Sequence, residues 1–186
     1  MSYYSVNNIK VSFQVSSENI QSVLKSVCEN SKYVTKKDLN FFVLRKNFVY
    51  VAFFTGHINC TKLKSLEDLE QCQKEFKTFF EQSEIPNLHF KSPIIDNISA
   101  SGGAALPRIN LQSFARHLVQ TEHTFRYNPE TFPGLTLRIQ PVTFTIFTSG
   151  KFIAVGAKRY VDLSISINLF LKNLRLFENQ NVTTTN

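Results

Sequence analysis

An internal repeat is the feature that most constrains how this 186-residue chain can fold. Apolar residues alternate from Asn8 to Val15, which predicts a strand with one buried face. An amphipathic helix, several β-rich segments and a longer helix follow, and the same order of patterns returns after Leu88. A chain that repeats one strand–helix–strands–helix pattern is expected to form two similar halves.

Matching residues in the two halves keep a nearly constant separation, which supports a true repeat. The pairs are Asn8 and Asn97 (89 positions apart), Arg45 and Arg138 (93), Gly56 and Gly150 (94), and Lys64 and Lys158 (94). The small drift predicts loop insertions in the second half. We expect one domain over residues 1–178, with repeat one at 6–86 and repeat two at 88–178, and a disordered polar tail at 179–186.

The last segment, from Tyr160 to Phe177, contains two conflicting patterns. VDLSISINL alternates strictly, which is typical of a strand, while apolar residues from Leu163 to Leu174 also recur at helical spacing. The segment has about 18 residues, and strands are rarely so long. We therefore predict a helix, which also matches the long helix of the first half.

Composition narrows the class of partner. The formal net charge is +7 and the isoelectric point about 9.4, which favours a polyanion, either nucleic acid or an anionic membrane. No apolar stretch has the length of a membrane span or the position of a signal peptide, so a membrane is not expected. Three cysteines without CxxC spacing are typical of a reducing compartment.

Residue patterns for catalysis or metal binding are not found in the sequence. The four histidines have no ligand spacing with Cys or carboxylates, and TSGK is too short for a phosphate-binding loop. We expect no enzyme activity, no metal and no cofactor.

One long motif resembles a known family. YNPETFPGLTLRIQPVTFTIFTSGKFIAVGAK, Tyr127 to Lys158, is similar to the second repeat of the TATA-box-binding protein family, and NNIKVS, VLR and FFTGHINCTKLK match its first repeat more weakly. The resemblance covers roughly residues 6 to 178. It implies an α+β fold, a pseudo-two-fold saddle in which two repeats form a curved antiparallel sheet with helices on the convex face.

The resemblance also implies apolar wedges that enter the DNA minor groove and unstack a base step. The second repeat keeps these wedges as Phe132 and Phe147, and Phe53 matches Phe147 in the first repeat. The counterpart of Phe132 is Leu39, which is smaller and stacks less well. Phe41 and Phe42 lie nearby, so an alternative register could supply a phenylalanine.

Strand alternation agrees with this facing of the wedges. Thr143, Thr145 and Phe147 share one strand face, and Val49, Val51 and Phe53 share the matching face in the first half. Val155 stands where the family has a threonine, so one polar contact is lost, while Thr61 keeps it. The residues that the resemblance assigns to the minor groove are Asn8, Asn97, Thr61, Val155, Val51 and Thr145.

Cations and loop residues complete the implied contacts. The phosphate contacts are Arg45, Arg138, Lys64, Lys151 and Lys158, with His57 at the place that matches Lys151. In the loop before the second wedge, Asn128 and Glu130 occupy the contact positions for transcription factor IIB. IIA-like proteins and TBP-associated factors are further implied partners.

Together these residues imply a general transcription initiation factor, resident in the nucleus, that binds and bends AT-rich promoter DNA and nucleates a preinitiation complex. The alternative is a related adaptor with weak or lost TATA binding that acts through protein partners, which Leu39, His57 and Val155 favour. Salt dependence distinguishes the two, because binding through several phosphate contacts weakens steeply as salt rises.

Overall fold

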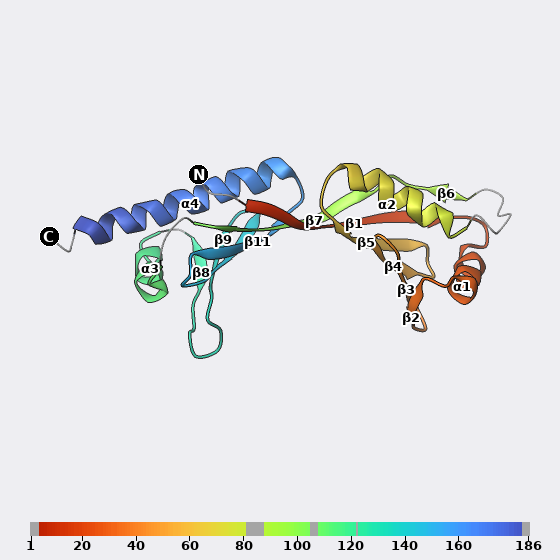
Figure 1. The fold of residues 1–186 in the computed structure, drawn as a ribbon, viewed down its shortest axis with the longest axis horizontal. Helices are drawn as coiled ribbons and strands as arrows, with labels where there is room; N and C mark the ends of the chain where they lie inside the picture. The colour runs from red at the N-terminus through yellow and green to blue at the C-terminus, as the bar shows by residue number, and fades with distance from the viewer. Residues whose placement is uncertain (1–3, 81–87, 105–107, 122, 184–186) are drawn as a thin grey trace. The chain divides into compact units, whose positions relative to one another are not determined.

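A computed structural model describes residues 4–80, 88–104, 108–121 and 123–183, with only the helical backbone for 180–183. Over these residues the chain forms eleven strands and four helices, an α+β protein with antiparallel strand pairing (Figure 1). The chain divides into two compact units. We call Asn8–Asp96 the N-unit, and Met1–Asn7 together with Asn97–Asn186 the C-unit.

The N-unit is an antiparallel sheet with two helices, one after its first strand and one after its fifth. Its strands are hydrogen-bonded in the order β2-β3-β4-β5-β1, and β6 also pairs with β1. The elements are most of β1 (Tyr4–Ser16), α1 (Ile20–Asn30), β2 (Val34–Lys37), β3 (Phe41–Arg45), β4 (Val49–Phe53), β5 (His57–Leu63), α2 (Glu67–Thr78), β6 (His89–Phe90) and the start of β7 (Ile94–Gly103).

The C-unit repeats this order of elements. Its strands are hydrogen-bonded in the order β7-β11-β10-β9-β8. The elements are the rest of β7, α3 (Leu111–Leu118), β8 (Thr124–Arg126), β9 (Leu135–Ile139), β10 (Val142–Ile146), β11 (Lys151–Ala157) and α4 (Tyr160–Thr183). The helix predicted for the last segment is confirmed, since burial against the strands selects the helical pattern over the alternating one.

In the N-unit, alternation along β1 separates a core face from an open face. Ile9, Val11, Phe13 and Val15 are buried, whereas the residues between them are partly accessible. Helix α2 covers the buried face: the Phe76 ring centroid lies 5.5 Å from that of Phe13. The apolar side of the strand thus fixes which side remains for a ligand.

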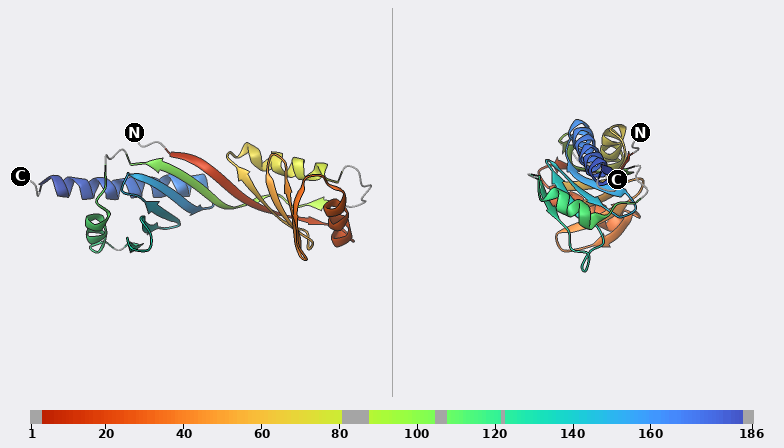
Figure 2. Two further views of the ribbon diagram at one scale, coloured as in Figure 1. Left: turned by 60° about the horizontal axis from the view of Figure 1, so that its bottom comes forward. Right: turned by 90° about the vertical axis from the view of Figure 1, so that its left-hand side faces the viewer.

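The C-unit buries its sheet in the same way. Phe144 of β10 stacks on Phe170 of α4, with ring centroids 4.4 Å apart and planes 7° from parallel. Figure 2 shows α4, in blue, running along the strands of this unit. In each unit we call the sheet face turned away from α2 or α4 the open face. The predicted facing of Thr143, Thr145 and Phe147 is confirmed, because their neighbours in β10 are buried.

Some elements were not predicted. The short polar strands β2 (VTKK) and β8 (TFR) carry no alternation that would reveal them. In the segment after Leu88, where the second repeat was predicted to begin, the chain forms two strands, β6 and β7, on either side of Pro93, which has no N–H for a ladder. Helix α4 continues to Thr183, past the start of the expected tail at 179, and residues 184–186 lie outside the described residues. The repeat and domain boundaries stay predictions.

The cysteines and the length of the helices complete the description of the fold. Cys28, Cys60 and Cys72 are buried and not disulfide-bonded. Burial raises the pKa of the Cys60 thiol, so this group stays protonated at neutral pH. Across the residues that the structure describes, no helix is both long and apolar enough to cross a membrane.

Candidate nucleic-acid interface

An aromatic pair stands on the open face of the C-unit. The Phe132 and Phe147 rings lie 6.1 Å apart, edge to face, and Phe132 is 46% exposed. The loop between β8 and β9, which projects from the unit in Figure 1, carries Phe132. Its turn is held by Asn128, whose carbonyl accepts the Phe132 N–H at 3.0 Å and whose Oδ1 accepts the Glu130 N–H at 3.2 Å.

Gly134 makes room for this pair. A Cβ at residue 134 would lie 2.7 Å from Cε1 of Phe132 and 3.2 Å from Cε1 of Phe147. Because real Cβ atoms essentially never approach a neighbour that closely, a side chain here would push the Phe132 ring away. The P-G sequence after Phe132 is therefore part of the site and does more than form a turn.

The N-unit forms its aromatic pair differently. Phe53 contacts Phe41, with ring centroids 5.7 Å apart, and the two residues face each other in the β3–β4 ladder. Leu39, the predicted wedge, is 93% exposed in the connection before β3. Phe42 is fully buried on the core face. Of the two alternatives left open by the sequence, only Phe41 lies on the open face.

Asn8 and Asn97 occupy equivalent positions in the two units. The Asn8 Oδ1 accepts the Lys62 N–H at 2.7 Å, and the Asn97 Oδ1 accepts the Gly156 N–H at 2.7 Å. The ladder register shifts at both places, with φ of 75° at Lys62 and 111° at Gly156. Because each Oδ1 receives a backbone N–H, the amide nitrogen is the group that can donate to an acceptor on a ligand.

The other predicted minor-groove residues also lie on the open faces. Thr61 pairs with Val49, and Val155 pairs with Thr143, so Thr61 and Val155 hold equivalent ladder positions. Val155 is 38% exposed, and so a methyl surface stands where the N-unit presents a hydroxyl. Val51 pairs with Asn59 and Thr145 with Ile153 in the central part of each sheet.

Exposed cations lie on the strands of both units and directly after them. The five predicted phosphate contacts, Arg45, Arg138, Lys64, Lys151 and Lys158, are all exposed. Two further cations on the outermost strands were not predicted from the sequence. These are Lys36, paired with Val43, and Arg126, paired with Thr136. They share a ladder position, because the offset of 93 that relates Arg45 to Arg138 also relates Val43 to Thr136. Recognising β2 and β8 would have revealed them.

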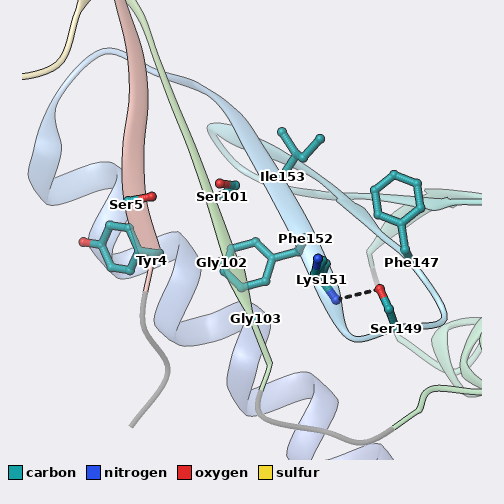
Figure 3. A pocket seen from close by; sticks show the side chains of 10 residues that line it. All are labelled: Tyr4, Ser5, Ser101, Gly102, Gly103, Phe147, Ser149, Lys151, Phe152 and Ile153. Carbon is teal, nitrogen blue, oxygen red and sulfur yellow. Dashed lines mark hydrogen bonds between the residues drawn. The ribbon is translucent and has the colours of Figure 1, made fainter.

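A hollow of about 740 Å³ borders Phe147 of the C-unit pair (Figure 3). It lies between the first residues of β1, the end of β7 and the start of β11. Phe147 and Lys151 stand on one side of it, and the Lys151 N–H donates to Ser149 Oγ at 3.4 Å. Two consecutive glycines, Gly102 and Gly103, form part of its lining, and a Cβ at Gly103 would meet nothing within 4 Å. This end of the open face can therefore accept a bulky group beside a cation.

The side chains on the open faces are of kinds that bind a ligand through stacking, hydrogen bonds and charge. Aromatic rings, amide donors and cations can stack on bases, donate hydrogen bonds and neutralise phosphates. Within the described ranges, no group of three or more His, Cys, Asp or Glu side chains could hold a metal ion.

Comparisons with known proteins agree with this description. The family described as "Transcription factor TFIID (or TATA-binding protein, TBP)" matches residues 92–177. TATA-box-binding protein 2 of Entamoeba histolytica is 32% identical over 127 residues, which are 67% of this chain and 55% of that protein. The TATA-box-binding protein of Methanothermobacter thermautotrophicus is 34% identical over 120 residues, 63% of each chain. The matched part thus spans only about half to two thirds of these relatives.

The structure of Methanococcus jannaschii TBP has the same fold, with a TM-score of 0.74, 24% identity, and coverage of 92% of this chain and 98% of that one. The fold and these matches define a class, the TBP-like proteins. This chain belongs to the TATA-box-binding protein family. The α+β, TBP-like fold expected from the sequence is confirmed.

Proposed function

We propose that this protein is a transcription initiation factor that binds promoter DNA in the minor groove, bends it, and nucleates a preinitiation complex. The observation that carries the proposal is the Phe132–Phe147 pair, with one ring nearly half exposed on an open sheet face. A solvent-exposed aromatic pair has little value for folding. Inserted at a base step it unstacks the bases, and the bent duplex offsets that cost with added contact surface.

The polar groups on the same faces favour the minor groove of AT-rich DNA. A·T pairs present acceptors there, adenine N3 and thymine O2, which suit the amide donors of Asn8 and Asn97. G·C pairs add the guanine amino group, which is a hydrogen-bond donor. An amide nitrogen also only donates, so it cannot accept a hydrogen bond from this group. The neighbouring Val51, Thr61, Thr145 and Val155 make a smooth surface without long side chains.

The cations and the net charge of +7 supply the sequence-independent part of the affinity. Arg45, Lys64, Arg138, Lys151 and Lys158 are the proposed phosphate contacts. Phe53, Phe132 and Phe147 are the apolar residues assigned to the base steps, and Leu39 is the further candidate that the sequence gives for the N-unit. The proposal places the protein where genomic DNA is transcribed, which in a eukaryotic cell is the nucleus.

Protein partners are assigned to the loop that carries Phe132. Asn128 and Glu130 are exposed there, and the Asn128 turn presents both residues next to the proposed DNA contact. A IIB-like factor that binds this loop would sense whether Phe132 is engaged with DNA. IIA-like proteins and TBP-associated factors are the other proposed partners.

The test is bending of a duplex labelled at both ends with a donor and an acceptor dye. A TATA element is compared with a scrambled sequence, for the native chain and for Phe132→Ala with Phe147→Ala. We expect TATA-selective energy transfer that the double variant loses. The matched control is Ile165→Ala with Leu169→Ala, two exposed apolar residues of α4, which should bend DNA normally.

A second candidate is an adaptor that has lost productive bending. Three departures in the site favour it: the exposed Leu39, His57 in place of a lysine, and Val155 in place of a threonine. Binding without bending, and with an affinity that hardly changes between low and high salt, would select the adaptor over the initiation factor.

A further inference from the structure

The two units use different positions for the second ring of the aromatic pair. The offset of 93 that relates Arg45 to Arg138 also relates Leu39 to Phe132 and Phe41 to Gly134. At the first of these two positions the C-unit has phenylalanine and the N-unit has leucine. At the second, two residues later, the C-unit has glycine and the N-unit has phenylalanine. The register of the ladders agrees with this match. Phe41 faces Phe53 in the β3–β4 ladder. Leu135 faces Ile146 in the β9–β10 ladder, so Gly134, one residue before Leu135, matches Phe147, one residue after Ile146.

The two arrangements exclude each other in space. In the C-unit, the Phe132 ring occupies the space over position 134, where a Cβ would come within 2.7 Å of it. In the N-unit a side chain does stand at the equivalent place, and the Phe41 ring itself packs on Phe53. A residue at position 39 therefore has no room to fold over Phe53, and Leu39 is accordingly 93% exposed.

The surroundings of Phe41 fit a nucleic-acid contact. The Lys36 Nζ lies 5.4 Å from the centroid of the Phe41 ring, which places a cation beside the pair. On the other side of the pair, the His57 ring lies 5.9 Å from that of Phe53. Phe41, Phe53 and His57 thus form an aromatic strip along the open face of the N-unit, with a cation at its end.

We propose that Phe41, and not Leu39, is the residue that acts with Phe53 on the DNA in the N-unit. The inference rests on the proposed function. Because Phe41 belongs to strand β3, whereas Phe132 lies on a projecting loop, the N-unit presents a strip of rings and the C-unit presents a protruding ring. The N-unit therefore unstacks its base step less than the C-unit does, and the protein distorts a TATA duplex asymmetrically.

The test uses 2-aminopurine, which fluoresces more strongly when unstacked, placed at each step of a TATA duplex in turn. Phe41→Ala is compared with Leu39→Ala. We expect Phe41→Ala to weaken binding about tenfold, the usual loss for one aromatic–base contact, and to lower the fluorescence at one step only. Leu39→Ala should change affinity less than about twofold. Phe132→Ala should lower fluorescence at a different step.

Two further variants guard against a folding defect. Phe41→Leu keeps an apolar side chain on Phe53 but cannot stack as widely, and it should show most of the loss while unfolding at a normal temperature. The double variant Leu39→Phe with Phe41→Gly installs the C-unit arrangement, and it should raise the fluorescence at the N-unit step.

The outcomes separate the inference from the function on which it rests. Loss of binding in Leu39→Ala but not in Phe41→Ala would overturn the inference and leave the proposed function intact. Equal and strong unstacking at both steps by the native chain would overturn the proposed asymmetry. A native chain that binds no TATA duplex would overturn the proposed function, and the inference with it.

Discussion

The packing of helix on sheet differs between the two units at equivalent positions of the repeat. The offset of 94 relates Tyr50 to Phe144, Phe76 to Phe170 and Glu75 to Leu169. In the C-unit the interface is apolar, and Phe144 stacks directly on Phe170. In the N-unit the Tyr50 ring lies 5.1 Å from that of Phe76, tilted by 48°, and a buried carboxylate stands beside it.

Glu75 is 8% exposed and ties α2 to the turn between β3 and β4. Its carboxylate accepts the Asn47 and Phe48 N–H groups at 3.3 and 3.2 Å, and the Tyr50 hydroxyl at 3.1 Å. The Tyr50 hydroxyl is also 2.8 Å from the Cys72 carbonyl oxygen. A buried carboxylate is tolerated only when its oxygens are satisfied, so in this unit a polar network does what apolar stacking does in the other.

The comparison shows which parts of the fold are free to diverge. The family match, residues 92–177, lies almost entirely in the C-unit. The N-unit differs from the C-unit in the helix interface, in the aromatic pair and in the residue at the strand bulge, yet it keeps the same order of strands and helices. Strand order and facing are therefore the shared requirement, and the chemistry on each face can change.

The largest effect is expected from Glu75→Ala. This change leaves the Asn47 and Phe48 N–H groups and the Tyr50 hydroxyl without the carboxylate that they contact. We expect the free energy of unfolding to fall by about 3 kcal/mol. Urea denaturation measures it, with Leu169→Ala as the control at the equivalent position, where the loss should stay below about 0.5 kcal/mol. A similar loss for both variants would contradict the difference between the interfaces.

Installing the C-unit residues sharpens the same comparison. Tyr50→Phe alone removes the donor to Cys72 and Glu75 and should cost about 1 kcal/mol. Combined with Glu75→Leu, the loss should be clearly smaller than the sum of the two single changes, because each removes a partner of the other. Strict additivity in this double-mutant cycle would show that the two groups are not coupled.

The bulge glycine of the C-unit should be the next most sensitive position. Gly156 has φ of 111°, and a Cβ there would lie 3.0 Å from the Pro141 carbonyl oxygen. Gly156→Ala should therefore destabilise the protein by about 2 kcal/mol, which thermal or urea unfolding would detect. Gly103→Ala is the control, since that Cβ meets nothing within 4 Å. If the two changes cost the same, strain at the bulge is not the cause.

For Lys62, the matching residue of the N-unit, we expect a substitution to change the free energy of unfolding in the opposite direction. Lys62 has φ of 75°, in the left-handed region that glycine adopts more easily. Lys62→Gly should raise the free energy of unfolding by about 0.5 kcal/mol, the relief of strain less the added freedom of the unfolded chain. A stability that falls instead would mean that the lysine side chain has a packing role that outweighs the strain.

The smallest effect concerns the carboxylates at equivalent helix starts, Asp68 and Asp162. Asp68 accepts the Lys64 and Ser65 N–H groups, while Asp162 pairs with the Arg159 guanidinium at 2.6 Å. Hydrogen bonding from Arg159 lowers the pKa of Asp162 below its ordinary value. The ionised Asp162 carboxylate therefore adds to the free energy of unfolding at pH values above the ordinary aspartate pKa. This contribution is lost as the pH falls through the lowered pKa of Asp162 in the folded protein.

Asp162→Asn should consequently reduce stability slightly at neutral pH and not at all in acid, below the lowered pKa. Unfolding temperatures measured from neutral pH down to about pH 2 would show the two curves converge. A gap that stays constant over that range would exclude the ionised form of Asp162 as its source.

Much of the fold could be predicted from the sequence, for physical reasons. Alternation in VTFTIF and in the Asn8–Val15 segment marks one buried face, so the strand facing follows directly. The segment after Tyr160 was ambiguous, and its length favoured the helix that is observed. Strands β2 and β8 were missed because they carry little apolar pattern and are held by pairing with β3 and β9.

The candidate site was only partly predictable. Phe132 and Phe147 follow from the family motif, which is long in the second half, and Asn97 follows from the repeat that pairs it with Asn8. The role of Phe41 depends on which ring fits over Phe53, a matter of space that no linear pattern shows. Lys36 and Arg126 were missed together with the strands that carry them.

Substituted duplexes test most directly the proposal that the open faces contact the minor groove. Replacing each A·T pair of the TATA element by I·C changes the major groove but keeps the minor-groove pattern of A·T, since inosine lacks the guanine amino group. We predict affinity and bending within about twofold of the A·T duplex, and strong loss for G·C. An I·C duplex bound as poorly as G·C, or all three bound equally, would contradict the account.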